Sequence, residues 1–128
     1  MTLRNECSAV VVDDHPLVAR GIADYLRTHC GFARAEAICH ADGLWTHLAQ
    51  VGIPTLALVD FWLPEGTALP MLAQLRAEYP GMRLLVISGD DDPAIRDKVH
   101  RLAVDGFVLK HAEPAVFARA VSAVLRGD

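Results

Sequence analysis

The sequence predicts one α/β domain, a doubly wound parallel sheet built as (βα)5 with helices on both faces. Short apolar runs alternate five times with longer stretches of helical periodicity, and this rhythm is typical of such a sheet. The chain has 128 residues, of which 52% are apolar. It is therefore long enough for one sizeable core and too short for two, and we expect a single domain over residues 1–128.

Each expected strand is a short run that is bounded by turn signals or ends at a polar residue. The second run is weaker than the other four. In chain order the expected strands are Ala9–Val12, Ala33–Ile38, Leu56–Val59, Leu84–Ile87 and Gly106–Leu109.

The first two expected helices follow the first two strands. One starts at Pro16, because proline fits the first turn of a helix, and it runs to Thr28. The other spans Ala41–Gln50, and the sequence Gly52-Ile53-Pro54 breaks the chain after it. The apolar face of the first helix is expected to consist of Val18, Ile22, Tyr25 and Leu26.

The last three expected helices begin near proline residues. A loop at Pro64–Gly66 precedes the third helix, which extends from about Leu69 towards Tyr79. The stretch Asp90–Pro93 opens the fourth, since acidic residues and proline suit the positive N-terminal end of a helix. The fifth starts near Pro114. Its apolar positions are Val116, Phe117, Ala120, Val121 and Val124.

Composition and charge argue against several classes of function. The net charge is -4, and the twelve Lys and Arg residues form no basic stripe, so we expect no direct nucleic-acid binding by this segment. No run approaches the roughly 18 apolar residues of a membrane span. We expect no export signal, because Arg4, Asn5 and Glu6 precede an apolar run of only four residues. The cysteines Cys7, Cys30 and Cys39 match no disulfide or zinc pattern, which favours the reducing cytoplasm. The six histidines lack metal-binding spacing and are expected to be surface or capping residues.

Polar residues stand where four of the apolar runs end. In a parallel sheet with right-handed crossovers these ends share one edge, so the residues are expected to converge there. Each alone is more often a helix cap or a solvated charge, but together they indicate a site. The residues are Asp13, Asp14, Asp60, Ser88 and Lys110.

Three carboxylates at one edge repel one another unless a divalent cation neutralises them. Oxygen ligands together with a phosphate favour Mg²⁺. With this ion bound, one carboxylate can attack a phosphoryl donor and form an aspartyl phosphate. Lys110 can supply a compact cation to one phosphate oxygen, and the Ser88 hydroxyl can donate a hydrogen bond to another.

Four sequence blocks resemble the receiver domains of bacterial two-component response regulators, in the order and spacing of that family. The DDHPLVxxGI start is most similar to the subfamily with a C-terminal LuxR-type helix-turn-helix output domain. The resemblance implies a flavodoxin-like strand order, 2-1-3-4-5. The four blocks are VVVDDHPLVARGI, LVDFWLPEG, LLVISG and DGFVLK.

The resemblance also implies a role for each site residue. Asp60 is the phospho-acceptor, and Lys110 contacts the phosphate. Ser88 and Phe107 are the switch residues, although Phe107 is also open to the simpler interpretation of a buried strand aromatic. The implied ligands of Mg²⁺ are Asp13, Asp14, Asp60 and the backbone carbonyl of Trp62.

The implied partner is a sensor histidine kinase, and the last helix is a candidate homodimer surface. The resemblance implies no enzyme in the usual sense, but a domain that catalyses its own phosphorylation and dephosphorylation and controls an output, with transcription expected. We expect DNA contact only through an output domain that is absent from this chain. We expect no membrane partner.

The sequence departs from the family at three places, and two other functions stay open. Ala68 replaces a usual glycine, Trp62 is bulkier than usual, and His111 replaces a proline, so we expect a trans peptide after Lys110. A haloacid-dehalogenase-type phosphatase places a second Asp where Trp62 stands, and a cap domain would not fit in 128 residues. A pseudo-receiver that serves only protein docking usually loses a residue of the acidic pocket or the lysine, whereas all are present here.

Overall fold

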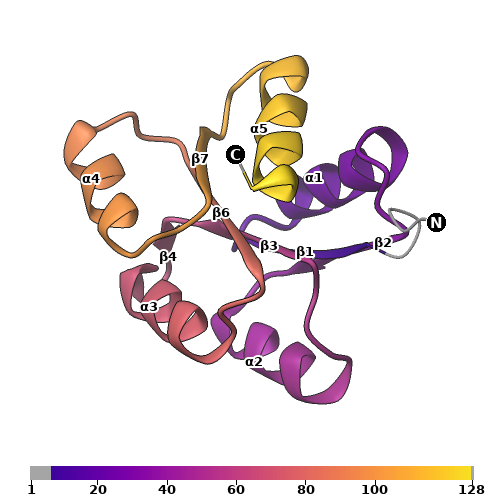
Figure 1. The fold of residues 1–128 in the computed structure, drawn as a ribbon, viewed down its shortest axis with the longest axis horizontal. Helices are drawn as coiled ribbons and strands as arrows, with labels where there is room; N and C mark the ends of the chain where they lie inside the picture. Colours follow the sequence, from indigo (N-terminus) through magenta and orange to yellow (C-terminus); the bar gives the residue numbers. More distant parts are fainter. Residues whose placement is uncertain (1–6, 128) are drawn as a thin grey trace.

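The computed structural model describes residues 7–127, which form a five-stranded sheet with helices on both faces (Figure 1). The sheet is parallel throughout, and its strand order is β2-β1-β3-β6-β7. Counted along the sheet-forming strands this is the order 2-1-3-4-5, so the predicted fold class is confirmed. The strands are β1 (Ser8–Val12), β2 (Arg34–Ile38), β3 (Leu56–Asp60), β6 (Arg83–Ser88) and β7 (Gly106–Leu109).

Helices α1 and α5 cover one face of the sheet, and α2, α3 and α4 cover the other (Figure 1). Proline stands in the first turn of α1, α3, α4 and α5, where its missing N–H costs no intrahelical hydrogen bond. The helices are α1 (Pro16–His29), α2 (Ala41–Gln50), α3 (Leu69–Glu78), α4 (Pro93–Arg101) and α5 (Pro114–Arg126).

The side chains of the central strands alternate between two apolar cores. On β1, Ala9 and Val11 face α1 and α5, whereas Val10 and Val12 face the other three helices. Both faces of β1, β3 and β6 are buried. This is why these strands are continuous apolar runs in the sequence and show no alternation of polar and apolar residues.

The predicted apolar face of α1 is partly wrong. Val18 is 37% exposed, and Ile22 and Tyr25 are only partly buried. Small alanine side chains let α1 approach the sheet closely, and the larger Ile22 and Tyr25 instead line a cavity of about 160 Å³ shared with Phe117 of α5. The α1 side chains that are buried are Ala19, Ala23 and Leu26.

Between β3 and α3 the chain forms a short antiparallel hairpin, where the sequence predicted only a loop. Its strands are β4 (Trp62–Leu63) and β5 (Gly66–Thr67). Gly66 has a φ angle of 132°, which favours glycine. Ala68, at the position where the resemblance implies glycine, has a φ angle of -83° and a buried side chain, so this junction does not require glycine.

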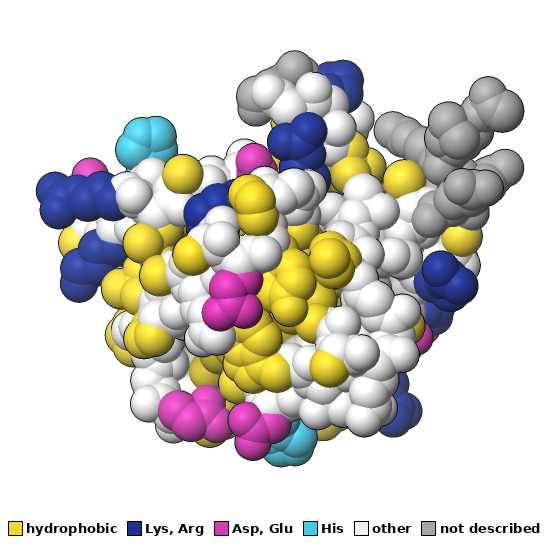
Figure 2. All heavy atoms as spheres, turned by 60° about the horizontal axis from the view of Figure 1, so that its bottom comes forward, with side chains coloured by type: hydrophobic (Ala, Val, Ile, Leu, Met, Phe, Trp, Pro, Cys, Tyr) yellow, Lys and Arg dark blue, Asp and Glu magenta, His cyan; other side chains and the backbone are white. Residues whose placement is uncertain are grey.

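The surface in Figure 2 shows exposed hydrophobic side chains in the middle of one face. The Lys and Arg side chains in this view lie in separate groups, and no basic stripe crosses this face. Within residues 7–127, none of the helices has the length and apolar character needed to cross a membrane.

Candidate phosphoryl-acceptor site

The carboxyl ends of four strands bring the predicted polar residues to one edge of the sheet. Asp60 is the last residue of β3 and Ser88 the last of β6. Asp13 follows β1 and Lys110 follows β7. Asp13, Asp60 and Ser88 are buried, at 0%, 3% and 0% exposure. Burial of two carboxylates at one sheet edge is costly without compensating charge, which indicates a functional site.

Lys110 joins the two buried carboxylates. Its Nζ atom lies 2.9 Å from Oδ2 of Asp60 and 3.0 Å from Oδ2 of Asp13. Its backbone N–H donates to the carbonyl of Ser88 at 2.7 Å, which continues the pairing of β6 and β7 by one residue and fixes the start of the side chain. The peptide between Lys110 and His111 is trans, as predicted.

The pKa values of these three groups are shifted by opposing causes. Burial raises the pKa of Asp60, and the charge of Asp13 adds to this, so the pKa lies above its ordinary value although Lys110 opposes the shift. Burial also raises the pKa of Asp13, but hydrogen bonds from the His15 backbone and from Lys110 outweigh it and hold the pKa low. Burial lowers the pKa of Lys110, but its two carboxylate partners outweigh this effect and raise it. Asp60 is therefore the carboxylate that most needs a further positive charge.

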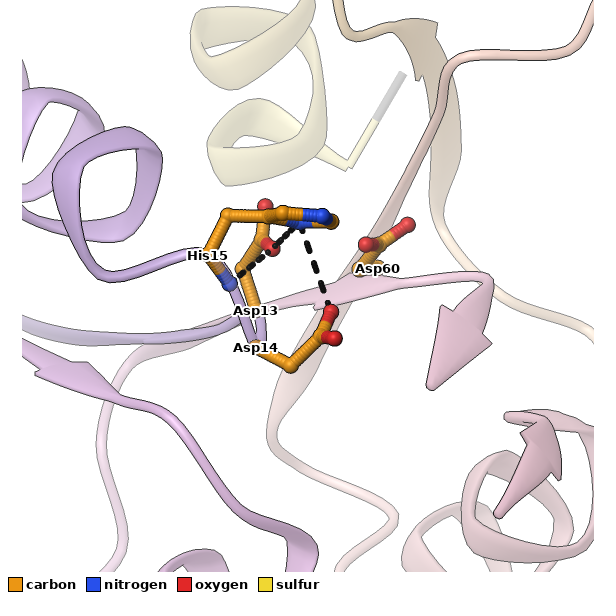
Figure 3. A group of neighbouring side chains, drawn as sticks. All are labelled: Asp13, Asp14, His15 and Asp60. Carbon is orange, nitrogen blue, oxygen red and sulfur yellow. Dashed lines mark hydrogen bonds and ion pairs between the residues drawn. The ribbon is translucent and has the colours of Figure 1, made fainter. Parts of the chain in front are cut away.

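His15 lies in the same cluster, although the sequence indicated only a surface or capping residue (Figure 3). Asp13, Asp14, His15 and Asp60 each offer a ligand atom, and these atoms lie within 4.8 Å of one another. Nδ1 of His15 is 2.9 Å from Oδ1 of Asp13 and 3.4 Å from Oδ1 of Asp14. His15 does occupy the N-cap position of α1. The one sequence signal for its contacts was its place directly after the two aspartates.

The predicted switch residues lie on neighbouring strands. Ser88 Oγ donates to the carbonyl of Asp90 at 3.1 Å and accepts from the N–H of Asp90 at 3.0 Å, so it is bound to its own loop. Phe107 on β7 is partly buried, and the guanidinium carbon of Arg96 lies 4.8 Å from its ring centroid. Their roles in switching stay predictions.

Trp62 begins the hairpin directly beyond the acceptor strand. Its backbone N–H donates to Oδ1 of Asp60 at 3.3 Å. Its indole is 49% exposed and packs edge-on against the ring of Phe61, with ring centroids 5.1 Å apart. The backbone of Trp62 thus lies beside the acceptor carboxylate, and metal binding by its carbonyl stays a prediction.

A family model for the response regulator receiver domain matches residues 9–122. The chain belongs to this family. Two curated relatives of this receiver domain are regulators of transcription. ExaE of Pseudomonas putida, a transcriptional activator protein, is 32% identical over 119 residues, which cover 92% of this chain and 55% of ExaE. RcsB of Escherichia coli, a transcriptional regulatory protein, is 24% identical over 126 residues, which cover 96% of this chain and 58% of RcsB. The chain thus spans little more than half the length of these relatives.

Solved structures of other regulators share the fold of this receiver domain. The signal receiver domain of NarL from Mycobacterium tuberculosis is 29% identical, with a TM-score of 0.81 and coverage of 96% of this chain and 98% of that chain. A LuxR family response regulator from Aurantimonas is 24% identical, with a TM-score of 0.82 and coverage of 95% and 86%, and this likeness concerns the fold alone. NarL, ExaE and RcsB together confirm the predicted similarity to LuxR-type regulators.

The acidic cluster of the receiver domain fits a hard divalent cation. The carboxylates of Asp13, Asp14 and Asp60 lie together, and the ammonium group of Lys110 contacts two of them, Asp13 and Asp60. Oδ1 of Asp14 is buried and accepts no hydrogen bond from the part of the chain that the structure describes. Oxygen donors with an excess of negative charge are what a hard cation requires.

Proposed function

We propose that this receiver domain accepts a phosphoryl group on Asp60 from a sensor histidine kinase and changes conformation in response. The observation that carries the proposal is the buried carboxylate of Asp60 with Nζ of Lys110 2.9 Å from its Oδ2 atom. One oxygen of Asp60 forms a bond to phosphorus while the bond from phosphorus to the donor breaks, and the donor leaves with that electron pair. The fold supplies position and charge, which are the main requirements of phosphoryl transfer.

The residues that would hold Mg²⁺ are Asp13, Asp14, Asp60 and, through its backbone carbonyl, Trp62. When bound, this ion neutralises the carboxylates and the oxygens of the incoming phosphoryl group. Lys110 keeps its proton, because its carboxylate partners raise its pKa. Its ammonium already lies beside the acceptor oxygen and can therefore contact the phosphate as soon as it is attached.

Switching follows from a change of partner at Ser88. Its hydroxyl proton is donated to the carbonyl of Asp90, so Ser88 must release this carbonyl to donate to a phosphoryl oxygen. That movement would pull on the loop between β6 and α4. Phe107, which pairs with Val86 across β6 and β7, would then turn further into the core.

We assign residues 1–128 to one receiver domain that catalyses its own phosphorylation and dephosphorylation and has no other enzymatic role. ExaE and RcsB act in transcription, which supports a transcriptional output and a cytoplasmic location. Contact with DNA is assigned to an output domain outside residues 1–128. We also propose a homodimer through α5, where Val116 is 41% exposed while Val121 and Val124 are buried in the core.

The two rival functions have less support. A haloacid-dehalogenase-type phosphatase needs a second Asp at the position of Trp62. A pseudo-receiver that only docks to proteins does not need a lysine in contact with a buried acceptor carboxylate, yet Lys110 makes this contact. The geometry therefore favours the phospho-acceptor.

Incubation with acetyl phosphate and Mg²⁺, followed by intact-mass measurement, tests the proposal. Wild type should gain one phosphate, and chelation of Mg²⁺ should prevent this. Asp60→Asn should gain none, whereas Asp97→Asn, which alters an exposed carboxylate on α4, should behave as wild type. The same adduct on Asp60→Asn would assign the acceptor elsewhere, and no adduct on wild type would favour the pseudo-receiver.

A further inference from the structure

The imidazole of His15 and the ammonium group of Lys110 contact different oxygens of Asp13. Asp13 is shared between the two, because its Oδ1 atom lies 2.9 Å from Nδ1 of His15 and its Oδ2 atom lies 3.0 Å from Nζ of Lys110. Oδ1 of Asp14, which accepts no hydrogen bond from residues 7–127, lies 3.4 Å from the same Nδ1 atom. Figure 3 shows the ring above Asp13 and Asp14, with Asp60 beside them. The pocket therefore has an ammonium side and an imidazole side.

The backbone that carries this ring is held on both sides. The N–H of His15 donates to Oδ1 of Asp13 at 2.9 Å, and its carbonyl accepts from the N–H of Ala19 at 2.9 Å. Pro16 follows, which restricts His15 to an extended conformation, and its φ and ψ angles are -101° and 100°. The backbone at His15 is thus fixed next to Asp13, and the imidazole, although 61% exposed, is held at the carboxylates by its contact with Oδ1 of Asp13.

The distances around Nδ1 match those between ligands of one small metal ion. Two donor atoms that each lie about 2.05 Å from an ion are about 2.9 Å apart at a right angle and about 3.4 Å apart at a tetrahedral angle. The Nδ1 atom of His15 lies at these two distances from Oδ1 of Asp13 and Oδ1 of Asp14. Each of these two spacings is compatible with binding of Nδ1 and a carboxylate oxygen to the same ion, and the ligand atoms of the cluster lie within 4.8 Å of one another.

We propose that His15 is a direct ligand that gives the acidic pocket a preference for first-row transition ions over Mg²⁺, and this inference rests on the proposed metal site. Imidazole suits Co²⁺, Ni²⁺ and Zn²⁺, whereas Mg²⁺ prefers oxygen donors and keeps several waters. Binding replaces the hydrogen bond that Nδ1–H donates to Asp13. The Nδ1 proton leaves to water, and the neutral ring that binds through Nδ1 carries its proton on Nε2. Mg²⁺ then uses the carboxylates alone, and a transition ion uses the carboxylates and His15.

Calorimetric titration of the full chain with Co²⁺ and with Mg²⁺ tests this role. His15→Ala should weaken Co²⁺ binding by about tenfold and leave Mg²⁺ binding within about twofold of wild type. His40→Ala is the matched control, since His40 is the N-cap residue of α2 as His15 is of α1. It also reports on any Co²⁺ held near Cys39. Pulsed electron paramagnetic resonance of bound Cu²⁺, an ion that suits imidazole, should detect nitrogen at the metal in wild type and His40→Ala, and none in His15→Ala.

The outcomes separate this inference from the proposed function. Equal preference for Co²⁺ over Mg²⁺ in wild type and His15→Ala, or nitrogen at the metal in both, would show that His15 is not a ligand. Asp14→Ala tests the metal site itself. Unchanged Mg²⁺ binding in Asp14→Ala would contradict the proposed function, whereas loss of Mg²⁺ binding there with no effect of His15 would overturn only the present inference.

Discussion

At the end of β3, burial and the charge of Asp13 disfavour the ionised form of Asp60, and the favourable interaction with Lys110 offsets only part of this effect. Asp13 differs because the backbone N–H and the ring of His15 and the ammonium group of Lys110, 3.0 Å away, all favour its ionised form. Two neighbouring carboxylates on one edge thus have opposite pKa shifts. One is a stable anion, and the other is an anion that gains from cation binding or from conversion to an acyl phosphate.

Asp60→Asn should stabilise the protein in the absence of divalent cations. The amide removes a disfavoured buried charge, and we expect the free energy of unfolding from urea titration to rise by about 1 kcal/mol at neutral pH. When folding raises the pKa of a carboxyl group, the free energy of unfolding of the protein falls as the pH rises through that pKa. The gain should therefore shrink as the pH falls through the raised pKa of Asp60. A variant less stable than wild type at neutral pH would contradict the account, and Asp97→Asn provides the control.

Trp62 should slow the loss of phosphate from Asp60. Its backbone contacts the acceptor carboxylate and its indole is half exposed, so the ring can form an apolar wall against the attacking water. Trp62→Asn should lose phosphate several-fold faster, which requires only about 1 kcal/mol, with Mg²⁺ affinity little changed. Trp62→Phe should stay close to wild type. Decay rates of Trp62→Asn within about twofold of wild type would mean that the indole lies flat on the surface and does not exclude water.

Residue identity at strand ends predicted most of this cluster, because parallel strands place their carboxyl ends together whatever the details of packing. His15 was missed for a physical reason. Regular spacing between histidines is the sequence signal of a metal site, whereas this ring contacts Asp13 through the direction of one side chain at the start of a helix. The hydrogen bond from Ser88 to Asp90 could not be predicted from the sequence either, since it depends on the conformation of one turn.

The sequence predicted which helices and strands exist better than it predicted where they end and which of their side chains are buried. The range of α2 was predicted without error, while β3 and β6 extend to Asp60 and Ser88 because strand pairing does not stop where apolar residues stop. The predicted apolar face of α1 was partly wrong because two of the side chains that it buries are the small residues Ala19 and Ala23. The hairpin of β4 and β5 has only two residues in each strand, which is too short to leave a periodic signal.

Helix α4 should restrain Phe107, the aromatic residue for which a switch role is predicted, through Arg96. Its guanidinium lies over the Phe107 ring and also binds Asp91, with Nη2 2.8 Å from Oδ1, so it links β7 to the loop after Ser88. Arg96→Ala should speed amide exchange in β7 and in residues 89–92 by about two- to fivefold, the effect of one exposed cation–π contact. Arg101→Ala removes a surface ion pair with Asp97 on the same helix and should leave amide exchange in these segments unchanged. Equal exchange in both variants would leave Phe107 a simple packing residue.

At the scale of the whole molecule, a buried apolar core lies on each face of the sheet, and the charged residues lie at one edge of that sheet. The five alternations of strand and helix predicted the layers, and the strand order came from resemblance to the receiver family, because local pattern does not say which strands are neighbours. With that order, β1, β3 and β6 lie next to one another and bring Asp13, Asp60 and Ser88 together from distant parts of the chain. The strand order therefore assembles the site, and the buried strands hold its residues in place.

The chemical identity of the phosphorylated residue is the most direct test of the central claim. Borohydride reduces an acyl phosphate on aspartate to homoserine, and peptide mass spectrometry then locates that residue in the chain. After treatment with acetyl phosphate and Mg²⁺, we predict homoserine at position 60 and at none of the other aspartates. Homoserine at Asp13 or Asp14, or a phosphate that survives reduction, would contradict the assignment of Asp60 as the acceptor.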